Sequence, residues 1–141
     1  MRVDGACHCG DVAFEAEVDP RHVVICHCED CQTFGGGPFR VRVLAPAGAL
    51  RLLRGAPSAY TKTAESGNER LMFFCPRCGT QTHATEKGEG PRPSSISAGV
   101  LSQKATLRPV AQYWCASRLD WLDGLSSVHR VERQSLASAE D

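Results

Sequence analysis

The stretch Cys75-Pro76-Arg77-Cys78-Gly79 decides the fold, because two thiols at this spacing are typical of metal ligands. A second pair of thiols stands far away in the sequence, in Cys7-His8-Cys9-Gly10. Four thiolates complete a tetrahedral zinc site, and a metal held by both pairs would clamp the start of the chain to its middle. We therefore predict a structural zinc site made of Cys7, Cys9, Cys75 and Cys78, with free buried thiols as the alternative.

A glycine directly follows each of these two pairs. Gly10 comes after Cys9, and Gly79 comes after Cys78. Glycine allows the backbone to turn so that its amides face the sulfurs. The pattern favours metal binding over free thiols.

Three further thiols lie close together in Cys26-His27-Cys28-Glu29-Asp30-Cys31. One loop and one helical turn can place these three sulfurs around a single ion. No fourth cysteine is near, so the last coordination position is left to water, substrate or another side chain. His27 stands between two ligands, and we expect its ring to point away as a packing or supporting group. Ligation by His27 is the alternative.

The charge of the three-cysteine group indicates which chemistry it suits. Three thiolates on Zn²⁺ leave a net charge of minus one, which makes the ion a weaker Lewis acid than zinc on three neutral imidazoles. Such a site is better at holding an incoming thiol in its nucleophilic thiolate form. Attack of a thiol on an aldehyde is therefore the reaction that we favour, ahead of attack of water on an ester or amide.

The residues after this group add a candidate ligand surface. The run Thr33–Phe39 holds three glycines, which would let a ligand approach the backbone closely, or would simply form a flexible turn. Arg40, Arg42 and Arg77 could meet a substrate carboxylate. Solvated charges on strands are the alternative for each arginine.

Composition and charge limit the other functions. The chain of 141 residues is one domain by length, and its 16 basic and 16 acidic residues cancel, so we expect neither nucleic acid nor membrane as a partner. No run approaches the roughly 18–20 apolar residues of a membrane span. The start of the chain has no apolar signal core, which predicts a cytoplasmic location and argues against a disulfide framework for the 8 cysteines.

Short apolar alternations between turn signals predict a mainly β fold of small antiparallel sheets. The expected strands are 11–18, 39–43, 50–53, 59–63, 70–74, 80–84 and 95–98. Loops are expected at 64–69 and 86–93, and helical turns only at 29–34 and after Ser117. Cys115 belongs to no group, and we expect it to be a buried structural thiol. Residues 126–141 are expected to form a polar C-terminal tail.

Taken together, the motifs resemble the glutathione-dependent formaldehyde-activating enzymes, a family that also contains the centromere-protein-V-like domains. The resemblance runs from about Gly5 to Gly124. It rests on residues 5–10, 26–31 and 74–80, on Gly99 and on the segment 117–121.

The resemblance implies a fold, a site and an activity. The fold would be a zinc-stitched β-tent with few short helical turns, over a domain of residues 1–125. Two Zn²⁺ would bind, the structural one at Cys7, Cys9, Cys75 and Cys78 and the catalytic one at Cys26, Cys28 and Cys31. The activity would be that of a carbon–sulfur lyase, which joins glutathione to formaldehyde as S-(hydroxymethyl)glutathione and also splits this adduct. The substrate would be a small thiol such as glutathione with formaldehyde or another aldehyde.

Two other functions stay open at this point. Both metals could staple a non-catalytic module that binds a protein or small ligand. The three-cysteine site could also act as a redox or metal sensor that loses zinc on oxidation. An exposed sheet edge could pair two copies as a homodimer.

Overall fold

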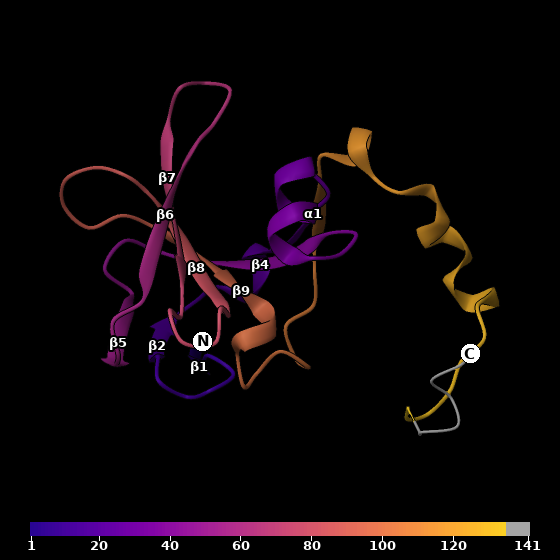
Figure 1. Cartoon of the computed structure of the whole chain (residues 1–141), viewed down its shortest axis with the longest axis horizontal. Helices are drawn as coiled ribbons and strands as arrows, with labels where there is room; N and C mark the ends of the chain where they lie inside the picture. The colour runs from indigo at the N-terminus through magenta and orange to yellow at the C-terminus, as the bar shows by residue number, and fades with distance from the viewer. Residues whose placement is uncertain (135–141) are drawn as a thin grey trace.

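The computed structural model describes residues 1–134, in which ten strands form two β-sheets (Figure 1). The smaller sheet has the order β1-β2-β5, and the larger one has the order β10-β3-β4-β9-β8-β7-β6. The small sheet consists of β1 (Arg2–Ala6), β2 (Ala13–Glu17) and β5 (Leu50–Arg54). The large sheet consists of β3 (Val23–Cys26), β4 (Arg40–Ala45), β6 (Ser58–Thr63), β7 (Glu69–Phe74), β8 (Gln81–Glu86), β9 (Ser94–Ser97) and β10 (Ala111–Tyr113).

The helical segments are short and lie between or after the strands. One α-helix, α1 (Glu29–Gly35), follows β3 directly. The rest are 3₁₀ turns: η1 (Pro20–His22), η2 (Ala98–Val100), η3 (Cys115–Ser117) and η4 (Asp120–Ser127). The prediction of a mainly β fold with few helical turns is confirmed, and both predicted helical regions are present.

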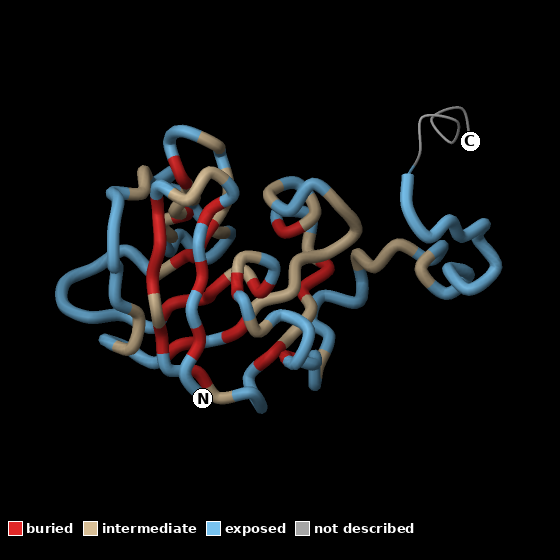
Figure 2. Tube along the Cα trace, turned by 90° about the horizontal axis from the view of Figure 1, so that it is seen from below, coloured by how far each residue is buried: buried red, intermediate tan, exposed pale blue. Residues whose placement is uncertain are grey.

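The hydrophobic core lies between the two sheets, where Figure 2 shows the buried residues gathered in the body of the domain. The alternation that predicted strand 11–18 supplies much of it, because Phe14, Ala16 and Val18 all point inward and are buried. From the large sheet, Val43 and Ile96 lie opposite each other in the β4–β9 register and are both fully buried. The core is small, so additional links between the sheets matter for stability.

Three strands were not predicted from the sequence. β1 contains Asp4 and Gly5, which are poor strand formers, and β3 and β10 span only 4 and 3 residues. The expectation of antiparallel pairing also needs one correction, because β10 runs parallel to β3. The two strands can pair in parallel because residues 27–110 lie between them and bring the chain back to the edge of the large sheet beside β3.

The end of the chain leaves the body of the domain. Beyond β10 the backbone extends away from the sheets (Figure 1) and is mostly exposed (Figure 2). Cys115 lies at the start of this segment and is exposed, so the prediction of a buried thiol was wrong. The predicted tail 126–141 begins inside η4, and its residues 135–141 lie outside the described part of the chain. Within residues 1–134, no helix combines the length and the apolar character that a membrane crossing requires.

Two cysteine clusters as candidate metal centres

Both groups of cysteines lie at the same end of the large sheet. β3 ends at Cys26, and β7 ends at Phe74, immediately before Cys75. In the large sheet, the neighbouring strands β3, β4, β9, β8 and β7 alternate in direction. The start of β4 at Arg40 and the start of β8 at Gln81 therefore lie at the same end as Cys26 and Phe74. Three strands, β4, β9 and β8, lie between the two groups of cysteines. Because both groups are at the same end of the sheet, they can border one solvent-accessible region.

The four-cysteine cluster, here called the quartet, brings Cys7, Cys9, Cys75 and Cys78 together. Their sulfur atoms all lie within 4.8 Å of one another. The Sγ atoms of Cys7 and Cys9 are 3.6 Å apart, and those of Cys9 and Cys75 are 3.7 Å apart. A tetrahedral zinc with Zn–S bonds of about 2.3 Å would separate its sulfurs by about 3.8 Å. These distances fit a metal and are far too long for disulfides.

The quartet links the two sheets. Cys7 and Cys9 stand in the loop between β1 and β2 of the small sheet, and the other pair stands in the turn between β7 and β8 of the large sheet. Cys7 and Cys75 are both buried and pack with Val12 in a small apolar cluster of their own. The His8 amide also donates to the Thr80 hydroxyl at 3.1 Å, and Arg77 pairs with Asp11, so a metal bound here would reinforce an existing link between the two segments.

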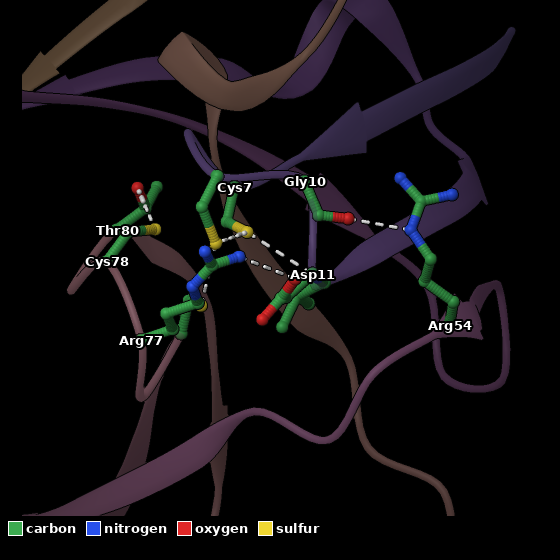
Figure 3. Close-up of polar contacts among 10 residues, drawn as sticks. Cys7, Gly10, Asp11, Arg54, Arg77, Cys78 and Thr80 are labelled. Carbon is green, nitrogen blue, oxygen red and sulfur yellow. Dashed lines mark hydrogen bonds and ion pairs between the residues drawn. The ribbon is translucent and has the colours of Figure 1, made fainter.

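Backbone turns and hydrogen bonds prepare the sulfurs of the quartet. Gly10 and Gly79 have φ of 85° and 79°, a left-handed conformation that glycine adopts without strain, which supports the role predicted for them. The backbone amide of Val12 donates a hydrogen bond to Sγ of Cys7 at 3.2 Å. The Thr80 hydroxyl lies 3.2 Å from Sγ of Cys78 (Figure 3) and is the main reason that the pKa of this thiol falls to about 5. Thiolates are the form that binds metal, so these contacts favour binding.

Two arginines lie on the surface beside the quartet. Arg77 pairs with Asp11, with 3.3 Å between Nη1 and Oδ1, and Arg54 donates from Nε to the carbonyl of Gly10 at 2.6 Å (Figure 3). Arg77 already has a carboxylate partner in its own chain. Of the two interpretations of this arginine, the solvated surface charge describes the structure better.

The three-cysteine cluster, here called the trio, comes from one strand end and one helical turn. Cys26 ends β3, Cys28 is the N-cap of α1, and Cys31 lies in the first turn of this helix. Sγ of Cys28 accepts a hydrogen bond from the backbone amide of Cys31 at 3.3 Å. The three sulfurs lie within 4.8 Å of one another, and no fourth His, Cys, Asp or Glu of the described residues joins them. This donor set fits a metal with one open position.

The electrostatics of the trio depend on Arg40. Burial alone would raise the pKa of the Cys31 thiol, but the nearby Arg40 guanidinium, by its charge and by hydrogen bonding, lowers this pKa below its ordinary value. Burial raises the pKa of Cys26 to about 12, and the neighbouring Cys31 thiolate adds a smaller contribution in the same direction. The trio therefore needs a cation to hold all its sulfurs ionised, whereas the arginine alone satisfies one of them.

His27 points away from the trio. Its ring is only 1% exposed, and its Nε2 donates to Oε1 of Gln112 on β10 at 2.8 Å. The ring also packs edge-on against Phe39, with 5.5 Å between the centroids. The prediction of a packing or supporting role is confirmed, and the parallel strand β10 is what holds this histidine.

Several residues that support the clusters were not predicted. Thr80 and Gln112 act through hydrogen bonds to a cysteine and a histidine, and Gln32 ties α1 to the carbonyls of His27 and Ser117 at 2.9 and 3.0 Å. Thr80 follows the second pair of thiols by two residues, which is a local signal that could have been used. Gln112 is 85 residues from its partner, and no local pattern points to it.

A cavity of about 410 Å³ opens at this end of the sheet, next to both clusters. Phe34, Gly35 and Arg40 border it on the side of the trio, and Gly79 and Gln81 border it on the side of the quartet. Its size lies in the range of small-molecule sites. α1 is anchored above the sheet by an ion pair between Lys62 Nζ and Asp30 Oδ2 at 2.7 Å, which fixes one wall.

The fold and the clusters together define a class: a small two-sheet β domain with one closed and one open cysteine site, each able to hold a metal ion. The family model described as glutathione-dependent formaldehyde-activating enzyme matches residues 2–117, and the chain belongs to this family. A crystal structure of a protein from Rhodobacter sphaeroides, solved by structural genomics, is similar, with a TM-score of 0.60 and 25% sequence identity. The match covers 77% of the present chain and 98% of that one, so the shared part is nearly the whole of the other protein.

Proposed function

We propose that this protein is a zinc-dependent carbon–sulfur lyase and synthase that forms and splits adducts of a small thiol with an aldehyde. The observation that carries the proposal is the trio, a cluster of three thiols with no fourth protein ligand among the described residues, beside a cavity that contains a half-buried arginine. Membership of the family favours glutathione as the thiol and formaldehyde as the aldehyde.

The proposed reaction needs no oxidant and no further reactant. In the synthetic direction the thiol sulfur attacks the carbonyl carbon, so that one carbon–sulfur bond forms as the carbonyl π bond breaks. The π electrons move to the carbonyl oxygen, which takes up the proton that the thiol gives up. The product is a hydroxymethyl thioether in the case of formaldehyde, and the lyase direction reverses each step.

The roles in this proposal divide between the trio and its surroundings. Cys26, Cys28 and Cys31 would hold the zinc, and the bound ion would supply a position at which an incoming thiol loses its proton more easily. Arg40 borders the cavity and would stabilise the negative charge that develops on the aldehyde oxygen. Phe34 and the glycine after it would shape the wall and let a small substrate come close.

The quartet would have a different role in the proposal. Cys7, Cys9, Cys75 and Cys78 would hold a second, structural zinc, because four thiolates leave no position for substrate. Both sites require reduced cysteines, and no disulfide forms among the described residues. We propose the cytoplasm as the location for this reason.

The experiment that tests the function follows adduct formation by NMR with purified protein loaded with zinc. Exchange between free formaldehyde hydrate and the hydroxymethyl adduct should be faster than the spontaneous reaction when glutathione is the thiol. Cysteine and a thiol without a carboxylate, 2-mercaptoethanol, serve as comparisons. The proposal fails if none of these thiols reacts faster than in buffer while the metal content is two zinc ions per chain.

A further inference from the structure

Another cavity lies on the large sheet beside the trio, where its lining residue Tyr113 on β10 pairs with Cys26 on β3. It has a volume of about 430 Å³, within the range of small-molecule sites, and no cysteine lines it. Its floor is formed by residues of β3 and β4 that are neighbours in the sheet register, Val24 and Arg42. We call it the arginine pocket, and its lining is Arg21, His22, Val24, Arg42, Leu44, Arg70, Ser95, Val110, Ala111 and Tyr113.

Arg42 in the floor of this pocket has no counter-charge. Its Nε is buried, and no described residue accepts a hydrogen bond from it. No ion pair of the described residues includes it. A partly desolvated guanidinium without an acceptor is unfavourable, so an anion that reaches its exposed nitrogens would be bound well.

Arg40 provides the comparison, because it stands two residues earlier on the same face of β4. Its Nε is also buried without a partner, but its guanidinium lies beside Cys31, reaches Oε1 of Gln81 at 3.5 Å, and stands over the ring of Phe34. The structure therefore supplies an anionic partner to the first arginine of the strand and none to the second.

The electrostatics of the arginine pocket are one-sided. Three arginines and a histidine line it, and none of its lining residues is acidic. Two of the arginines are already paired outside it, Arg21 with Asp19 at 2.8 Å and Arg70 with Glu86 at 3.3 Å. These rim charges still contribute to a positive potential, while Arg42 is left as the direct partner for an anion.

Apart from Ser95 and the hydroxyl of Tyr113, the rest of the lining is apolar, which disfavours a simple inorganic ion as the occupant. Leu44, Val110 and Tyr113 are among the large hydrophobic residues that remain exposed, at 42%, 62% and 51%. All three line the pocket and surround the charged floor. An occupant with a hydrophobic body would cover them, which a hydrated phosphate or sulfate would not do.

We propose that the arginine pocket binds a small carboxylate with an apolar body, with the carboxylate on Arg42 and the body against Leu44, Val110 and Tyr113. The planar guanidinium and the planar carboxylate suit each other in a two-point hydrogen-bonded pair. This inference does not rest on the proposed lyase activity.

The test uses 4-phenylbutyrate as the probe and 4-phenylbutanol, its uncharged counterpart, as the matched control ligand. Binding to the zinc-loaded protein is followed in ¹H–¹⁵N spectra that include the arginine Nε–Hε signals. The carboxylate should shift the Arg42 signal saturably and bind at least about tenfold more tightly than the alcohol. Equal binding of both compounds, or no saturation up to about 10 mM carboxylate, would overturn the proposal.

Three variants test which arginine contributes most to the affinity for the carboxylate. Arg42→Met keeps the length of the side chain and should weaken carboxylate binding at least about tenfold, while Arg42→Lys should restore part of it. Arg21→Met removes a rim charge that Asp19 already neutralises, and should weaken binding less than about threefold. If Arg42→Met keeps the spectrum of a folded protein and binds the probe like the unchanged chain, the assignment is wrong.

A competition experiment distinguishes two sources of the carboxylate. Val24 and Arg42 lie two residues along their strands from Cys26 and Arg40, a separation of about 7 Å, so a thiol substrate that reaches the trio could extend a carboxylate this far. Displacement of the probe by S-methylglutathione would identify the occupant as the carboxylate end of the thiol substrate. Probe binding that S-methylglutathione leaves unchanged would identify a separate carboxylate ligand.

Discussion

The quartet and the trio are built from the same side chain but differ in where their ligands come from. The quartet joins the β1–β2 loop of the small sheet to the β7–β8 turn of the large sheet, whereas the trio is contained in one strand end and one helical turn. Removing a metal from the first would release two sheets with a small shared core. Removing one from the second would release only a local loop. The position of the ligands in the fold, as well as their number, therefore distinguishes a site that can hold two sheets together from one whose metal could be lost without unfolding the domain.

The largest effect is expected from Cys75→Ser in the quartet. Cys75 is fully buried, and metal binding at such a site contributes directly to folding, so we expect a loss of more than about 3 kcal/mol in the free energy of unfolding. Chemical denaturation followed by circular dichroism measures it. Cys115→Ser is the matched control, because this exposed thiol lies outside both clusters and its loss should change stability by less than about 0.5 kcal/mol.

Cys28→Ser in the trio should separate activity from stability. Serine is a good helix N-cap, so the variant should keep α1 and lose less than about 1 kcal/mol of stability. Metal binding at the trio should nevertheless fail, and adduct formation should fall at least about a hundredfold. Zinc content and the NMR assay measure the two effects side by side. If Cys28→Ser unfolds as Cys75→Ser does, the trio is also structural and the two clusters do not differ in this respect.

Acid should release metal from the trio before the quartet. Protons compete with metal for each thiolate, and a thiol with a lower pKa loses this competition only at lower pH. Burial and neighbouring thiols leave each cluster with one thiol of strongly raised pKa, about 11 for Cys9 of the quartet and about 12 for Cys26 of the trio. The ordering therefore rests on the number of thiolates, because protonation of one leaves three ligands in the quartet and only two in the trio. As pH falls, one zinc per chain should therefore appear first, and a chromogenic chelator will count it. Release of both ions in a single step would contradict the ordering.

Features that depend on residues close together in the sequence could be predicted, and features that depend on residues far apart in the sequence could not. The cysteine spacings and the alternation in β2 and β4 are local patterns, and they led to both clusters and to the core strands. Cys115 was assigned to the interior because free cysteines usually are buried, but the chain leaves the sheets at this residue and tertiary context overrides the preference.

The parts that were missed depend on contacts that are distant in sequence. β10 is too short to show a pattern, and its place beside β3 is fixed by pairing and by the contact between Gln112 and His27. The different surroundings of Arg40 and Arg42 were equally hidden, because alternation places both on one face and says nothing of what covers each. The sequence pattern shows which residues lie on the same face of a strand. It does not show which of them will form an ion pair or a hydrogen bond with a residue distant in the sequence.

Arg40→Met should weaken metal binding at the trio. The guanidinium of Arg40 lowers the pKa of Cys31, and its loss should make that sulfur a poorer ligand. Contacts of this kind around metal ligands are worth about 10–100-fold in affinity or activity, so we expect at least about a tenfold loss of affinity. Competition with a chelator of known affinity measures it. Restoration of affinity in Arg40→Lys would show that the charge matters rather than the packing.

The smallest effect is expected from Arg77→Met beside the quartet, which mirrors the previous variant. Arg77 is exposed and pairs with Asp11 across water-accessible space, and exposed ion pairs are worth about 0–1 kcal/mol. The charges of Asp11 and, next, of Cys9 raise the pKa of Arg77, so this arginine also interacts with the quartet. Its side chain is exposed, however, and Thr80, the Val12 amide and buried packing also hold the sulfurs, so metal affinity should change less than about threefold. Chelator competition under the same conditions gives the comparison. A tenfold loss of metal affinity in Arg77→Met would mean that the quartet, like the trio, depends on a nearby arginine. Burial of Cys7 and Cys75 would then not be enough to make its metal affinity independent of surface charge.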